Sequence, residues 1–163
     1  MSQLNLNYFE LFNLSISIDI NLEDLDKKYL KLQSQFHPDK FVRATSIEKS
    51  MAARISTHLN DGYNTLKDLI TRVDYILYLK NYKKDESTTF KNKEFLLNQI
   101  TLTEKIESAN KNELEKIKID LKDKIREITS ELKKNLSSND FETMSDNLAM
   151  IKFYRKNLIN IIN

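Results

Sequence analysis

Apolar residues recur at spacings of three and four along most of the chain, which is the period of an amphipathic helix. In the first half this pattern predicts long helices over residues 22–36 and from Ser46 onward, with shorter helices over residues 8–14 and 71–79. A short polar segment joins the two long helices, so we expect them to pack as an antiparallel hairpin. Their apolar stripes comprise Leu25, Tyr29, Leu32 and Phe36, and then Met51, Ile55, Leu59, Tyr63 and Leu66.

Three helices are predicted in the second half, over residues 93–108, from Asn110 onward and over residues 139–162. They follow a polar stretch, residues 81–92, whose Ser, Thr, Lys and Asp content is typical of a linker. Because short turns join the three helices, we expect a small bundle. The two longer stripes comprise Leu114, Ile117, Leu121, Ile125, Ile128, Leu132 and Leu136, and then Phe141, Met144, Leu148, Ile151, Leu158 and Ile162, with Arg155 unexplained inside the second.

Composition and capping signals favour an all-α fold. One glycine and one proline in 163 residues leave almost no material for tight hairpin turns between strands. Asn and Thr residues stand where helices are predicted to begin, and acidic residues follow three positions later, as in a capping box. These pairs are Asn21 with Asp24, Thr45 with Glu48, and Asn110 with Glu113.

Charge and cysteine content narrow the functional classes. The net charge of +2 is too balanced to indicate a nucleic-acid-binding protein, which usually carries a concentrated basic surface. The absence of cysteine excludes disulfides and thiolate metal sites. We expect neither a bound metal nor a cofactor. No apolar run approaches the roughly 20 residues that span a bilayer, and the N-terminal segment lacks the features of a targeting signal. We expect no membrane association and a cytoplasmic location.

The sequence FHPDK contains the only proline, Pro38, between His37 and Asp39. A proline ends the preceding helix and favours an extended backbone at the residue before it. His37 and Asp39 are therefore expected at the exposed tip of the helical hairpin. The tripeptide alone is also compatible with a simple turn. An acid–base pair is a weaker alternative, because the chain offers no accompanying nucleophile, metal set or phosphate-binding loop.

Lysines off the apolar stripe of the second helix form a flank that continues into this loop. They are Lys27, Lys28 and Lys31, followed by Lys40. Such a face is often only solvated, but beside a loop fixed by proline it would form a compact basic surface for an acidic partner. His58, near the apolar stripe of the next helix, is interpreted as structural.

Residues 1–80 resemble a J domain through the segment LEDLDKKYLKLQSQF, the HPDK loop, LNDGYNTLKD and RVDYILYL. In that family the His-Pro-Asp loop and the basic second helix engage a DnaK-class chaperone and stimulate its ATP hydrolysis. The resemblance therefore implies that His37, Pro38 and Asp39 signal to the chaperone, and that Lys27, Lys28, Lys31 and Lys40 contribute to docking.

The first helix of the bundle is apolar on two sides. With Phe95 set at zero, Gln99, Leu102 and Ile106 fall within about 40° on a helical wheel, whereas a second group lies at about 100–200°. Phe153, in the last helix, falls near 180° from the Met144 stripe. We infer that a surface patch for a protein partner comprises Leu96, Leu97, Ile100 and Phe153. The alternative is that the linker or the J domain covers these residues.

Across nearly its whole length the chain resembles the HscB family, J-type co-chaperones of iron–sulfur cluster assembly, through NYFELFNL, FHPDKF, RVDYILYL and FLLNQITLTEKIE. The resemblance implies an N-terminal J domain, a linker and a C-terminal three-helix bundle over residues 93–163. It further implies a chaperone partner, HscA, and a scaffold partner, IscU, bound through the patch, with Glu104 at a nearby acidic position. Thr101 and Thr103 depart from the Glu and Arg that are common in the family.

The resemblance implies a co-chaperone rather than an enzyme. Two alternatives stay open at this point: a J-domain protein with a different client, in which the bundle dimerises or binds clients generally, and a helical nucleic-acid-binding protein that uses its lysines.

Overall fold

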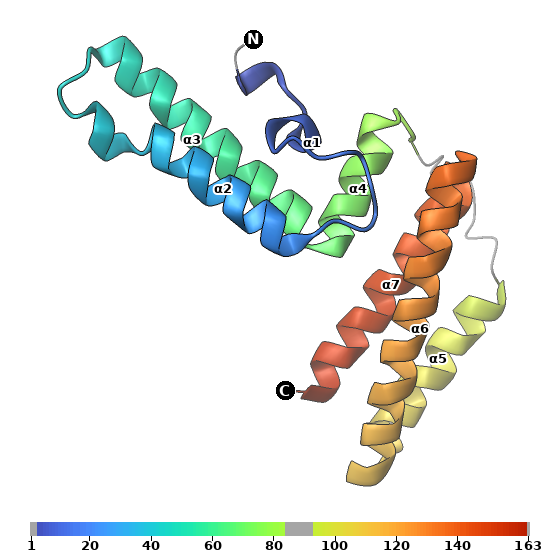
Figure 1. The fold of residues 1–163 in the computed structure, drawn as a ribbon. Coiled ribbons are helices and arrows are strands. Elements are labelled where there is room, and N and C mark those ends of the chain that lie inside the picture. Colours follow the sequence, from blue (N-terminus) through green and yellow to red (C-terminus); the bar gives the residue numbers. More distant parts are fainter. Residues whose placement is uncertain (1–2, 84–92, 163) are drawn as a thin grey trace. The chain divides into compact units, whose positions relative to one another are not determined.

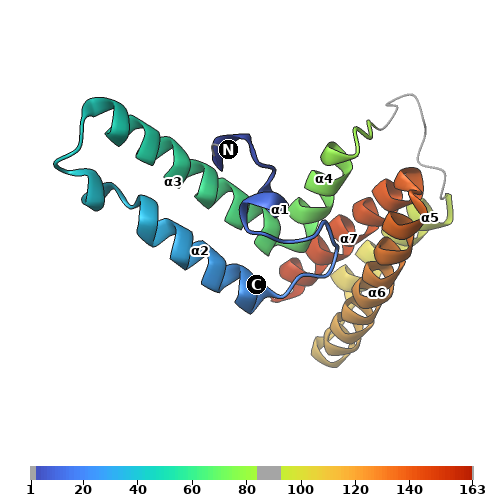
Figure 2. The same ribbon diagram turned by 45° about the horizontal axis from the view of Figure 1, so that its top comes forward.

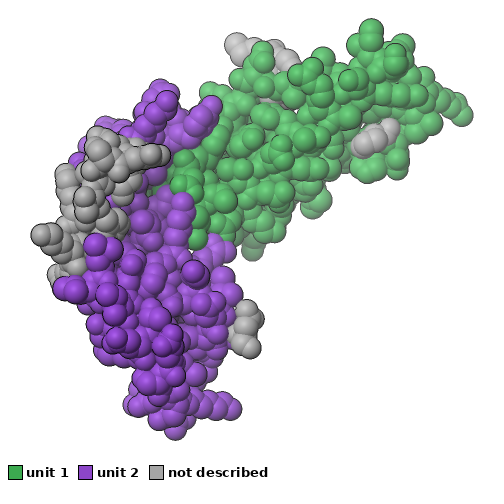
Figure 3. Space-filling model, turned by 180° about the vertical axis from the view of Figure 1, so that it is seen from behind, with its two compact units in different colours: residues 1–76 green, residues 77–163 purple. Residues whose placement is uncertain are grey.

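The computed structural model describes residues 3–83 and 93–162, and within these ranges every regular element is a helix, which confirms the predicted all-α fold class. The chain divides into two compact units, residues 1–76 and 77–163 (Figure 3). Most of the expected linker, residues 84–92, lies outside the described residues. The domain boundaries at 80 and 93 therefore stay predictions.

The first unit is built around an antiparallel hairpin of α2 (Leu22–Phe36) and α3 (Ser46–Lys67), as predicted (Figure 1). A short 3-10 helix, η1 (Gln3–Asn5), and α1 (Tyr8–Leu11) precede it and lie against α3. Phe9, Phe12, Leu25, Leu59 and Leu66 form the centre of the core with almost no exposed surface.

The capping residues explain where these helices begin. Asn21 accepts a hydrogen bond from the backbone N–H of Asp24 at the start of α2. Thr45 and Glu48 form a reciprocal capping box at the start of α3. Asn7 forms another with Glu10 and so begins α1, which ends at Leu11 rather than at the expected residue 14.

The buried face of α3 differs from the predicted stripe. Met51 was placed in the core but is 43% exposed, whereas Ala52 and Ser56 are buried. The face that packs against both α1 and α2 centres on Ile55 and Leu59, which leaves Met51 at its edge.

The helix α4 (Leu69–Leu79) begins two residues earlier than expected. The Asp68 side chain accepts hydrogen bonds from the backbone N–H groups of Ile70 and Thr71 and so caps this start. Buried Arg72 donates from Nη1 to the carbonyl oxygen of Leu66 at 2.8 Å, which ties α4 to the end of α3. Burial lowers the pKa of Arg72.

The second unit contains a three-helix bundle of α5 (Lys93–Ser108), α6 (Lys111–Ser138) and α7 (Phe141–Ile162), which run side by side in both ribbon views (Figure 2). Two-residue turns join them. Asn110 caps α6 through a capping box with Glu113. Asn139 was expected to begin the last helix, but it ends α6 in the left-handed conformation, with φ 56°, and Asp140 caps α7 instead.

Phe95, Leu121 and Tyr154, one from each helix, form the buried centre of one cluster in the bundle, and partly buried residues surround it. On α7 the buried positions drift from Met144, Leu148 and Ile151 toward Tyr154 and Asn157. The change arises because α7 packs on α6 and also meets α5, where the Tyr154 ring contacts the ring of Phe95 with 5.7 Å between centroids. It corrects the predicted stripe, since both Arg155 and Ile162 are exposed.

Candidate functional site

The segment FHPDK lies at the tip of the α2–α3 hairpin (Figure 1). His37 ends α2 with an extended backbone, φ −62° and ψ 132°, as expected for a residue before proline. Residues 38–41 then form a 3-10 helix, η2 (Pro38–Phe41), in which the backbone N–H of Lys40 donates to the carbonyl oxygen of His37. The proline therefore starts a new short helix rather than a plain turn.

The side chains of His37 and Asp39 are both exposed and lie close together. Nδ1 of His37 accepts from the backbone N–H of Asp39 at 3.4 Å and lies 3.5 Å from a carboxylate oxygen of the same residue. The first contact requires an unprotonated Nδ1, and the second becomes an ion pair only when Nδ1 carries a proton. Either contact holds the imidazole against η2. No described residue bonds to its Nε2, which is therefore available to a partner protein.

The lysines of α2 divide into two kinds. Lys27 and Lys31 are exposed and take part in no ion pair with any described residue. Lys28 lies 2.7 Å from the Asp24 carboxylate and also donates to the carbonyl oxygen of Asn13 at 3.0 Å. The ammonium group of Lys28 is thus already engaged within the fold, whereas those of the other two are available.

A polar network joins the two helices that carry the loop. Tyr29 donates from its hydroxyl to Oδ1 of Asn60 at 2.9 Å, and Gln33 donates to the same oxygen at 3.3 Å. Ser56 donates to Oε1 of Gln33 at 3.3 Å. The sequence argument placed Tyr29 in an apolar stripe and missed this network. Its signal was the polar pairs at spacing four on facing helices, Tyr29 with Gln33 and Ser56 with Asn60.

His58 is partly buried, and its Nε2 lies 3.2 Å from the carbonyl oxygen of Leu6. Its ring also contacts the ring of Tyr8, with 5.2 Å between centroids. Both contacts are with the segment that packs onto α3, which agrees with the structural role expected from the sequence.

The predicted patch residues of α5 are exposed. Leu96, Leu97 and Ile100 have 41%, 67% and 61% of their surface accessible, although Phe95, next to them in sequence, is buried. The alternative, that the linker or the J domain covers these side chains, stays a prediction, since residues 84–92 lie outside the described residues. Glu104, also exposed, follows Leu97 and Ile100 on the same face of α5.

Phe153 is placed differently from the expectation that it points away from the core. It is partly buried, and its ring meets the buried ring of Phe95 edge-on, with 5.6 Å between centroids. The helical wheel missed this contact because the buried face of α7 drifts along the helix. Phe153 thus packs against the core residue Phe95 and exposes only part of its side chain at the surface.

Thr101 and Thr103, two exposed residues of α5, form hydrogen bonds within their own helix. Their hydroxyls donate to the carbonyl oxygens of Leu97 and Gln99, at 3.2 and 2.9 Å. This i−4 bonding is usual for threonine in a helix and uses the donor of each hydroxyl.

None of the helices in residues 3–83 and 93–162 is both long and apolar enough to cross a membrane.

Sequence comparison identifies relatives that match almost the whole chain. Residues 91–161 match a family model described as the HSCB C-terminal oligomerisation domain. A co-chaperone protein HscB homolog of Colwellia psychrerythraea is 32% identical over 160 residues, which cover 93% of this chain and 91% of the relative. A homolog of the same name from Shewanella amazonensis is 34% identical over 160 residues, with coverages of 93% and 92%.

Solved structures agree with the sequence relatives. The chaperone HscB from Vibrio cholerae is 28% identical, with a TM-score of 0.82 over 96% of this chain and 95% of the other. The human co-chaperone protein HscB is 26% identical, with a TM-score of 0.89 over 96% of this chain and 81% of the other. These structures confirm the predicted architecture of a J domain and a C-terminal helical bundle. The chain therefore belongs to the HscB family of co-chaperones.

Proposed function

We propose that this chain is a cytoplasmic, non-enzymatic co-chaperone with two separate binding sites. The first comprises His37, Pro38, Asp39 and Lys40 of the loop with the lysines of α2, and it stimulates ATP hydrolysis by the DnaK-class chaperone HscA. The second comprises Leu96, Leu97, Ile100, Glu104 and Phe153, and it holds the iron–sulfur scaffold protein IscU for delivery to that chaperone.

The observation that carries the proposal is an exposed polar tip on the first unit together with an exposed apolar face on the second unit. His37 and Asp39 project from a rigid hairpin, and Leu97 and Ile100 project from a bundle whose own core is filled by other residues. A contiguous exposed apolar patch on a small protein usually marks a binding surface for another protein. His37, Asp39, Leu97 and Ile100 are all exposed, so none of these four side chains belongs to a hydrophobic core.

Two measurements on matched variants test the proposal. We expect His37→Gln to abolish stimulation of the steady-state ATPase of the chaperone while leaving the calorimetric affinity for the scaffold unchanged. Leu97→Ala should do the reverse: the stimulation by the co-chaperone alone persists, and the scaffold affinity falls. Unchanged stimulation by His37→Gln would refute the role of the loop, and full scaffold affinity in Leu97→Ala would refute the role of the patch.

Self-association through the same patch is a second candidate function for the bundle. The matched family model is described as an oligomerisation domain, and exposed leucine and isoleucine side chains suit contact between identical copies. In sedimentation experiments, a concentration-dependent dimer that Leu97→Ala dissociates would favour this function. A protein that stays monomeric at all concentrations would argue against self-association and favour scaffold binding as the function of the patch.

A further inference from the structure

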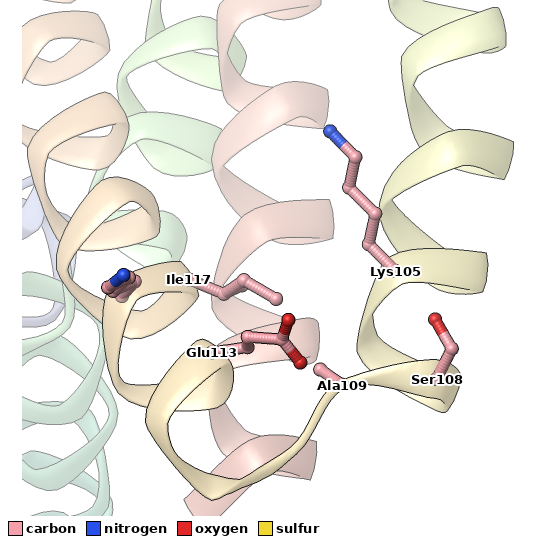
Figure 4. Close-up of a pocket in the computed structure, with 6 residues that line it drawn as sticks. Lys105, Ser108, Ala109, Glu113 and Ile117 are labelled. Atoms are coloured by element: carbon pink, nitrogen blue, oxygen red, sulfur yellow. The ribbon is translucent and has the colours of Figure 1, made fainter.

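A groove runs between α5 and α6, beside the apolar patch. Two adjoining hollows of about 390 and 310 Å³ make it up, and both are lined by Lys105, Lys116 and Ile117. In Figure 4 Lys105 extends from α5 into the space between the helices, and Glu113 and Ile117 extend toward this space from α6. Leu102 and Ile117 supply apolar surface to the second hollow, so the groove combines an apolar wall with cationic groups.

The charges in the groove are unevenly paired. Glu113 is engaged at the start of α6, where its carboxylate accepts from the backbone N–H of Asn110 at 2.8 Å. Asp120 lies 3.0 Å from the ammonium group of Lys124. Lys105 and Lys116 are in no ion pair with any described residue. The ammonium groups of Lys105 on α5 and Lys116 on α6 are therefore left without an ion pair. The nearby carboxylates, both on α6, are already bonded elsewhere.

Tyr154, from α7, adds an independent observation. Its side chain lines the second hollow and is only 9% exposed, yet no described residue hydrogen-bonds to its hydroxyl. Among the described residues the buried side-chain nitrogen or oxygen without a partner is Nε of Arg72, so the Tyr154 hydroxyl is not enclosed and opens onto the hollow, where a bound molecule can reach it. Burial raises the pKa of Tyr154, so the hydroxyl keeps its proton at neutral pH and can donate. Asn98 lines the same hollow. The groove therefore offers hydrogen-bond donors from four side chains, those of Lys105, Lys116, Tyr154 and Asn98, and few acceptors that are not already bonded.

The groove is continuous with the patch. Leu97, Thr101 and Lys105 follow one another at spacings of four along α5, so they form one row on the helix surface. Leu97 belongs to the patch, and Thr101 and Lys105 line the groove. A protein bound across Leu97 and Ile100 would reach the lysines with its next few residues.

We propose that the α5–α6 groove binds an acidic segment of the same protein that occupies the apolar patch. Carboxylates of that segment accept hydrogen bonds from Lys105, Lys116 and the Tyr154 hydroxyl, while its methylene groups pack on Leu102 and Ile117. The apolar patch supplies most of the affinity, and the groove selects partners that carry negative charge beside their apolar anchor. This inference rests on the proposed scaffold-binding function, whose docking surface it extends.

The test is calorimetric titration of the scaffold protein IscU into the full-length chain at several salt concentrations. We expect Lys105→Glu and Lys116→Glu each to raise Kd about fivefold or more, since each replaces an attraction by a repulsion. Both variants should also weaken the dependence of Kd on salt. Tyr154→Phe, which removes only the hydroxyl, should raise Kd without changing the salt dependence. Lys122→Glu, an equal charge change on α6 outside the groove, is the matched control and should leave Kd within twofold.

The outcomes separate this inference from the proposed function. If Leu97→Ala weakens binding but both groove lysine variants retain wild-type Kd and salt dependence, the patch stands and the groove proposal is overturned. If Lys122→Glu weakens binding as much as they do, the effect is one of overall charge, and the proposal also fails. If the wild-type chain does not bind the scaffold at all, both proposals fall together. Circular dichroism verifies that each variant is folded, and Lys105→Gln serves where a reversal of charge prevents folding.

Discussion

Phe153 of α7 meets Phe95 of α5 edge-on, with the two ring planes at 89° to each other. This arrangement is favourable for aromatic pairs and is worth about 0.5–1.5 kcal/mol beyond the burial of their surface. Because Phe95 is a central core residue and Phe153 is partly accessible, the pair links the interior of the bundle to the surface that we propose binds the scaffold.

Phe153→Ala is therefore expected to change two quantities at once. The free energy of unfolding should fall by about 2 kcal/mol, less than for a fully buried phenylalanine, and the scaffold affinity should also fall. Leu97→Ala should lower the affinity by about 1 kcal/mol or more while changing the unfolding free energy by less than about 0.5 kcal/mol. Urea unfolding and calorimetry on the same samples check this. Equal stability of the two variants would contradict the role of Phe153 in packing.

Gly62→Ala should destabilise the first unit, although alanine is the better helix former. Gly62 is the only glycine of the chain and lies buried in α3. A Cβ atom there would come within 2.9 Å of Cδ1 of Tyr8 and 3.2 Å of Cε2 of Phe12. Stacking on Tyr75, with 4.6 Å between centroids, restrains the Tyr8 ring.

The helix propensity of alanine returns about 1 kcal/mol, whereas overpacking of this kind costs about 1–3 kcal/mol. We expect a net loss of about 1 kcal/mol in urea unfolding. Asn64→Ala, at an exposed position of the same helix, is the control that isolates the propensity gain. A stabilised Gly62→Ala protein would show that α1 can move away from α3 at no cost.

The lysines of α2 should contribute unequally to chaperone binding. Lys31→Gln is expected to weaken association with the chaperone and to reduce its salt dependence, because the free ammonium group faces solvent. Lys28→Gln should have a smaller effect on association, since Asp24 and the carbonyl oxygen of Asn13 already hold its ammonium group. Surface plasmon resonance at two ionic strengths measures both. A larger loss for Lys28→Gln would mean that the chaperone displaces its contacts within the fold.

The capping box of α3 should make stability depend on pH in the acid range. Hydrogen bonds from the backbone N–H and the hydroxyl of Thr45 lower the pKa of Glu48. A carboxyl with a lowered pKa stabilises the folded state above its ordinary value of 4.5 and loses that contribution as the pH falls through the folded-state value. The unfolding free energy of Glu48→Gln should therefore decline less steeply below pH 4.5 than that of the wild type.

Thr45→Ser keeps both donors and is the control for this experiment. It should retain the steeper wild-type decline in urea titrations at a series of pH values. Parallel curves for Glu48→Gln and the wild type would show that the capping carboxylate carries no such dependence.

Local signals were sufficient to predict much of the fold. Asn21, Thr45 and Asn110 cap helices where the sequence indicated, because a cap depends on residues only three positions apart. Pro38 ended α2 for an equally local reason. The helix starts at Asp68 and Asp140 were missed although both are capping residues, because the apolar stripes alone set those expectations.

Features that depend on tertiary packing were predicted less well. The exposure of Leu97 followed from the helical wheel of α5, since one helix face suffices to infer it. The contact of Phe153 with Phe95 and the exposure of Arg155 did not, because a wheel at a constant 100° ignores the drift of the buried face along α7. Likewise, the groove lysines come from two helices and lie together only when those helices pack.

The polar network between α2 and α3 has a mechanical consequence. Leucine and phenylalanine contacts between two helices tolerate sliding, but the bonds of Asn60 to Tyr29 and Gln33 have one allowed alignment. A slip of one turn, about 5.4 Å, would leave these partly buried groups without partners. The network therefore fixes the lengthwise register of α2 against α3, and with it the place of His37 at the tip of the hairpin.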